Sequence, residues 1–130
     1  MVTIYKSDTF INILYYQISG LVRRSEAIEL ETHFRKYYSN LSNVITVMYI
    51  MDDATLSEKS FLNKLADINT QHKTIINCTY VVGLTGVRKL FYNIYKFLTP
   101  SDPVQIILKQ TLEDIERCLL VNFKTDFSRT

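Results

Sequence analysis

The sequence predicts an α/β domain in which a mostly parallel sheet of four or five strands is covered by helices. Short, apolar, β-branched segments alternate along the chain with segments whose apolar residues recur at helical spacing, and this alternation is typical of β-α-β units. The chain has 130 residues, of which 47% are hydrophobic and 22% charged, as expected for one globular domain. We therefore expect a single domain over residues 1–130 with right-handed crossovers.

The chain is expected to open with a β-hairpin. Val2–Tyr5 and Phe10–Ile18 are rich in β-branched and aromatic residues, and the polar segment between them is turn-prone. Since so short a connection cannot form a crossover, the first strand must pair antiparallel to the second at one edge of the sheet. Gly20 closes the hairpin.

A helix and a buried strand follow the hairpin. Ser25 is expected to cap the helix. Its apolar positions recur at helical spacing and are Ala27, Leu30, Phe34, Tyr37, Tyr38 and Leu41. Val44–Met51 (VITVMYIM) is a continuous apolar run that is short and β-branched, which predicts a central strand buried on both faces.

The second half of the chain continues the alternation. Its expected elements are a helix capped by Thr55 and Glu58, a strand within Ile75–Leu84, a helix carrying Val87 to Leu98, a strand at Val104–Leu108 and a helix capped by Thr111 and Asp114. The two prolines, Pro100 and Pro103, end the helix before them. The full order is β-β-α-β-α-β-α-β-α.

Three stretches carry a resemblance to a known family. They are Phe10–Gly20 (FINILYYQISG), Val44–Asp52 (VITVMYIMD) and Tyr80–Leu98 (YVVGLTGVRKLFYNIYKFL). Together with the order of elements, they resemble the STAS domain, especially the small bacterial proteins related to anti-sigma-factor antagonists. The resemblance implies a regulatory, protein-binding module that is not an enzyme and needs no cofactor.

The resemblance also directs attention to the start of the second helix. Phosphorylated STAS members carry an Asp-Ser-Ser-Gly-like motif there, whereas this chain has Asp52-Asp53-Ala54-Thr55-Leu56-Ser57-Glu58-Lys59-Ser60. The motif is absent, but Ser57 and Ser60 lie near its place, so they form a candidate phosphorylation or partner site together with Asp52 and Asp53. A phosphate at Ser57 would meet free backbone amides at the positive end of the helix. The alternative is that these hydroxyls serve only as helix caps.

A second candidate site lies in the turn after the fourth strand. Gly83, Thr85 and Gly86 precede the cation Arg88, so backbone amides and a positive charge could hold an anion or another ligand there. The pattern matches neither a Walker loop nor the dinucleotide fingerprint. A tight strand-to-helix turn, which also requires glycine, is the competing explanation.

Phosphotransfer at Asp52 or Asp53 is a further alternative, because a response-regulator receiver keeps an acidic phosphoacceptor after its central strand. Receivers hold magnesium with acidic residues after their first parallel strand. Here that segment is Ser19-Gly20-Leu21-Val22-Arg23-Arg24, which is basic. The sequence therefore favours a non-enzyme.

Charge and isolated reactive residues limit the remaining functions. The net charge of +2 is too small to predict nucleic-acid binding. Cys78 and Cys118 are expected to be buried free thiols, and His33 and His72 surface residues, so we expect no metal site. No secretory signal or membrane-spanning run is visible, so we expect a cytoplasmic protein. The expected partner is another protein, and the alternative function is to carry a small apolar or lipid-like ligand.

Overall fold

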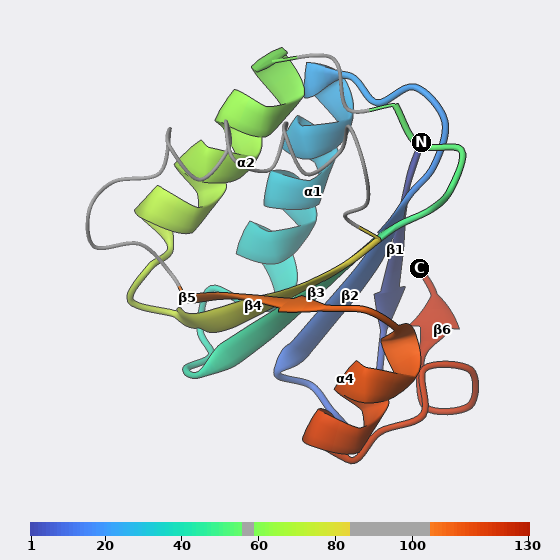
Figure 1. Cartoon of the computed structure of the whole chain (residues 1–130). Coiled ribbons are helices and arrows are strands. Elements are labelled where there is room, and N and C mark those ends of the chain that lie inside the picture. The colour runs from blue at the N-terminus through green and yellow to red at the C-terminus, as the bar shows by residue number, and fades with distance from the viewer. Residues whose placement is uncertain (56–58, 84–104) are drawn as a thin grey trace.

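The computed structural model describes residues 1–55, 59–83 and 105–130, which form one mixed sheet with helices on both faces (Figure 1). The elements are β1 (Val2–Lys6), β2 (Ile13–Ile18), α1 (Arg24–Tyr37), β3 (Val44–Ile50), α2 (Lys59–Gln71), β4 (Ile76–Val82), β5 (Gln105–Lys109), α4 (Leu112–Leu119) and β6 (Ser128–Arg129). Helices α1 and α2 cover one face, and α4 lies on the other. Among the described residues, no helix is long and apolar enough to cross a membrane.

The sheet has six strands in the order β5-β4-β3-β2-β1-β6. Strands β2 to β5 are parallel neighbours, and β1 is antiparallel to both β2 and β6. The predicted α/β class and the opening hairpin are confirmed, as is a central strand at β3 with hydrogen-bonded neighbours on both sides. The sheet is mixed because β1 is antiparallel to β2. Strand β6, which the sequence analysis did not predict, adds a second antiparallel pair with β1 and takes the edge position expected for β1.

The face under α1 and α2 holds the larger core. Phe34 of α1 and Phe61 of α2 are almost fully buried against Leu14 and Ile18 of β2. An ion pair at 2.9 Å between Glu31 and Lys64 joins the two helices, and both side chains are largely buried. Loss of one partner would leave the other charge buried and uncompensated, so this pair ties the two helices to a single relative position.

The opposite face is covered by α4 and the segment that follows it. Ile115 of α4 is fully buried, and Phe123 and Phe127 pack with it on Tyr15 and Val47 of the sheet. The predicted cap of α4 is confirmed, because Thr111 and Asp114 make reciprocal side-chain bonds to each other's backbone N–H. Helix α4 therefore starts at a fixed point over the sheet.

Two details of the first and last helices correct the sequence analysis. Ser25 does not cap α1, because the helix already begins at Arg24 and the cap position is Arg23, with no side-chain hydrogen bond. The buried Val22 anchors the chain just before this point, so helical geometry starts as soon as the chain leaves it. Cys118 is exposed rather than buried, because it lies in the last turn of α4, one turn beyond the fully buried Ile115, near the partly buried Tyr80.

The histidines are also less exposed than expected. The His72 ring lies 4.7 Å from the Phe34 ring, and the His33 ring lies 4.8 Å from that of Tyr37. Burial is the first cause that lowers the pKa of both, with nearby cations adding to it.

The predicted third helix and Glu58 lie outside the described residues.

Gly83 ends β4 in a conformation that other residues rarely adopt. Its φ is +98°, and a Cβ built there would lie 2.1 Å from the Ile50 carbonyl oxygen of β3. The neighbouring strand thus approaches so closely that only glycine fits. This favours the tight-turn explanation for Gly83 over an anion-binding role.

We expect Gly83→Ala to lower the free energy of unfolding by more than about 3 kcal/mol, because it combines backbone strain with a clash against main-chain atoms. Gly20→Ala is the matched control, since Gly20 also has positive φ (+59°) but open space around its Cβ. It should cost only about 1 kcal/mol. Urea denaturation of both variants would measure the difference, and equal losses would contradict the close approach.

Candidate functional site

A groove of about 580 Å³ lies on the α4 face of the sheet. Its lining comes from β1 to β4 below and from α4 and the C-terminal segment above. The lining residues are Tyr5, Tyr15, Gln17, Tyr49, Met51, Val82, Gln110, Thr111, Leu112, Glu113, Phe123, Lys124 and Phe127. This volume is within the range of small-molecule sites.

The strand register places the groove floor at the carboxyl end of the parallel strands. Gln17, Tyr49 and Val82 pair across β2, β3 and β4 in one row. Gln17 and Tyr49 are each the second-last residue of their strand, and Val82 is the last of its own. Open α/β sheets bind ligands at this end.

Side-chain hydrogen bonds fix the segment that covers the groove. Asn122 Oδ1 accepts from the N–H groups of Lys124 and Thr125, at 3.0 and 3.3 Å. Asp126 accepts from the Asn122 N–H at 2.7 Å, and Glu116 of α4 accepts from the Phe123 N–H at 2.8 Å. These bonds form a compact turn that holds the two phenylalanines over the sheet.

A chain of polar contacts crosses the aromatic floor. The Tyr5 hydroxyl donates to Gln17 Oε1 at 3.4 Å, and Gln17 Nε2 donates to the Tyr15 hydroxyl oxygen at 2.7 Å. Burial is the main cause that raises the pKa of Tyr15 to about 12, so the hydroxyl keeps its proton near neutral pH. Tyr15 therefore offers a permanent hydrogen-bond donor beside the groove.

The loops after β2 and β3 form a second candidate surface, which we call the loop surface: Leu21, Asp52, Asp53 and Thr55. The Thr55 N–H donates to the Gly20 carbonyl at 2.7 Å, and Leu21 forms an isolated parallel β-bridge with Thr55. All four residues are exposed, and Leu21 is 52% exposed although it is large and apolar. The two loops thus present an apolar side chain next to two carboxylates in one fixed arrangement.

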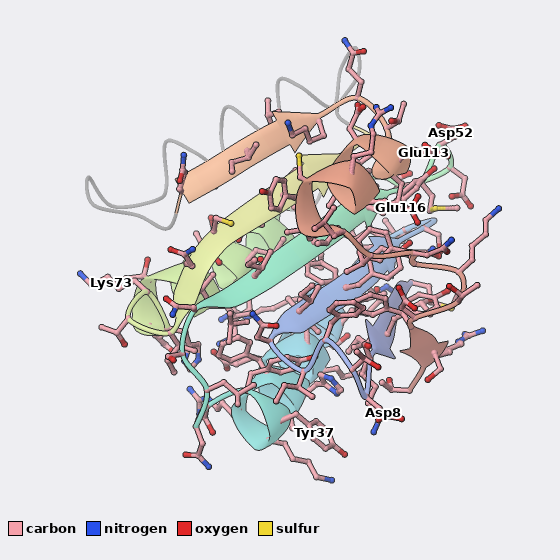
Figure 2. The ribbon with its side chains drawn as sticks, turned by 90° about the horizontal axis from the view of Figure 1, so that it is seen from below. Asp8, Tyr37, Asp52, Lys73, Glu113 and Glu116 are labelled. Carbon is pink, nitrogen blue, oxygen red and sulfur yellow. The ribbon has the colours of Figure 1, made fainter. Side chains whose placement is uncertain are left out.

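Only some of the predicted site residues lie in the part of the chain that the structure describes. Asp52 and Asp53 lie in the turn after β3, and Figure 2 shows Asp52 at the opposite end of the molecule from Tyr37 and Asp8. Ser60 falls in the first turn of α2, and its side chain is outside the described part of the chain. Ser57, Thr85, Gly86 and Arg88 also lie outside the described residues.

Sequence reasoning missed the groove. The pattern that could have indicated the groove is the alternation of side chains along the strands. Tyr15 and Gln17 of β2 lie on the same face of the sheet, as do Tyr49 and Met51 at the end of β3. A further signal was the Phe123 and Phe127 pair among turn-forming Asn and Asp residues.

Comparison with known proteins adds no functional assignment. No protein-family model matches the chain, and no curated protein matches it. Within the ranges that the structure describes, no three His, Cys, Asp or Glu side chains are grouped so as to hold a metal ion.

Alkaline titration should show a late phase to which Tyr15 and Tyr38 both contribute. Burial raises the pKa of Tyr15 and of Tyr38 to about 12, from an ordinary value of 10.0. The native state thus holds these protons more tightly than the unfolded state, and stability should fall as the pH rises from 10 toward 12.

Phenolate absorbance should show a late phase that Tyr15→Phe and Tyr38→Phe each reduce. A late phase that survives in both buried-site variants would contradict the assignment.

Proposed function

We propose that the protein is a non-enzymatic, protein-binding regulatory module of the STAS type, which acts in the cytoplasm. The order of its strands supports this proposal. From β1 to β5 the strands lie side by side in chain order, with the first antiparallel to the rest. That arrangement fits the order of elements on which the resemblance to anti-sigma-factor antagonists is based.

The loop surface is the observation that carries the proposal. An exposed leucine beside carboxylates suits a partner with an apolar pocket and a basic rim. Backbone hydrogen bonds hold both loops in place, from Met51 N–H to the Ile18 carbonyl at 2.8 Å and from Thr55 N–H to the Gly20 carbonyl. Little conformational entropy is then lost on binding.

A phospho-switch at Ser57 or Ser60 extends the same proposal. Both residues follow the loop surface directly in sequence. A phosphate would add about two negative charges within a few residues of Asp52 and Asp53 in the sequence. Such a charge would change the affinity of the loop surface for a basic partner without any rearrangement of the sheet.

Leu21→Asp should weaken partner binding at least tenfold with little change in thermal stability, because Leu21 is exposed. Ile11→Asp is a matched control, since Ile11 is 59% exposed in the turn before β2, at the other end of that strand. Affinity capture from the native cell, followed by titration of the captured partner, would compare the three proteins. Equal affinities would argue against the loop surface.

The groove supports a second function, the transport or sensing of a small apolar molecule. Its floor and cover are largely aromatic, and it has the volume of a ligand site. This function does not require catalysis and is compatible with a regulatory role.

Native mass spectrometry of the protein mixed with a lipid and metabolite extract should detect a bound small molecule. Tyr49→Trp should reduce the bound fraction severalfold, since the larger ring would fill the groove beside Met51 and Val82. Tyr37→Trp, on the surface of α1, should bind as the unaltered protein does. An absence of any bound species, or equal occupancy in both variants, would contradict the carrier function.

A further inference from the structure

We propose that the groove selects a flat, uncharged aromatic ligand that carries a carbonyl oxygen, and that the Tyr15 hydroxyl donates the hydrogen bond that recognises this oxygen. The inference rests on the carrier function proposed above and specifies the class of ligand. Its basis is the polar chain on the groove floor, together with the arrangement of the rings around it.

The hydrogen-bond inventory of Tyr15 leaves one position to fill. Its oxygen accepts from Gln17 Nε2, but no acceptor for its own proton occurs among the described residues. Tyr15 as a whole is only 2% exposed but lines the groove, so a partner for this hydroxyl proton has to come from the groove side. A buried donor without a partner costs free energy, and a ligand oxygen in the groove would supply the missing acceptor.

Gln17 sets the direction of this donor. Its side chain is held at both ends, by the Tyr5 hydroxyl at 3.4 Å and by the Tyr15 oxygen at 2.7 Å. The Tyr15 oxygen already has one donor, so the hydroxyl proton must point away from Gln17. A carbonyl with its lone pairs in a plane suits a single fixed donor of this kind.

The rings of the groove favour a flat ligand. Tyr15 already stacks with Tyr5 at 4.9 Å between centroids, and the Phe123 ring lies tilted against it at 4.5 Å. Tyr49 lines the groove, is half-buried and has no ring partner in the described part of the chain. Its free face is therefore a stacking platform for an aromatic ligand.

The charges of the groove favour a neutral ligand. Its two charged lining residues, Glu113 and Lys124, have opposite signs, and the floor between them is aromatic. Both side chains are exposed, so an ionised group of the ligand that lies over the rings would lose water without a charge buried beside it. A carbonyl loses far less and regains a hydrogen bond from Tyr15.

A pair of isosteric probes tests the inference: methyl naphthyl ketone, and isopropenylnaphthalene, in which a methylene group replaces the carbonyl oxygen. Calorimetric titration should show that the protein binds the ketone about three- to tenfold more tightly than the alkene, the range expected for one neutral hydrogen bond. Tyr15→Phe should bring this ratio close to one. The amide shifts of Gln17 and Phe123 in NMR spectra should move with both probes and locate them in the groove.

Two further variants keep the outcome decisive. Tyr37→Phe removes an exposed hydroxyl on α1, outside the groove lining, and should leave the ratio unchanged. Gln17→Met removes the group that orients Tyr15 and should lower the ratio, so it replaces Tyr15→Phe if that variant fails to fold. A ratio near one in the unaltered protein, or a ratio that survives Tyr15→Phe, would overturn the inference while leaving the carrier function in place. Failure of both probes to bind would overturn the carrier function as well.

Discussion

Strand β3 is the constraint on which the rest of the structure depends, because it is paired on both sides and buried on both faces. Val44 and Met48 lie under α1 and α2, and Val47 lies under the α4 face. Because five of its seven residues are buried, β2 and β4 must pair with β3 in one register, and layers on both faces must close over most of it. The approach of Gly83 to the Ile50 carbonyl shows how close that pairing is at the carboxyl end.

The same register determines the chemistry of the groove. Side chains alternate between the faces of a strand, so a shift by one residue would move Tyr15 and Gln17 from the groove to the helix-covered core. That core has polar requirements of its own. The hydroxyls of Thr46 and Thr79 meet at 2.5 Å across β3 and β4, and both residues are buried. A shifted register would therefore separate a buried polar pair as well as dismantle the groove floor.

The sequence predicted those features that depend on local pattern. The apolar run of β3 and the Thr111–Asp114 cap are each readable within a few residues, and Asp52 and Asp53 were placed correctly after the central strand. Strand β6 was missed because two residues carry no periodic pattern, and its position depends on the turn at Asn122. The groove was missed because its residues come from separate strands, from α4 and from the C-terminal segment, and they meet only through the register of the sheet. Ser25 failed as a cap because the chain turns into the helix directly after the buried Val22, and the cap position, Arg23, lies two residues before Ser25.

The two proposed functions share one end of the sheet, and Met51 connects them. Met51 lines the groove, its N–H bonds the Ile18 carbonyl, and the next residue is Asp52 of the loop surface. A ligand that displaces Met51 would therefore alter the position of the acidic turn that a partner meets. Thermodynamic linkage then requires the partner to change ligand affinity by the same factor. In this arrangement, the two proposed functions, carrying a ligand and regulating a partner, would be coupled through the carboxyl end of the sheet.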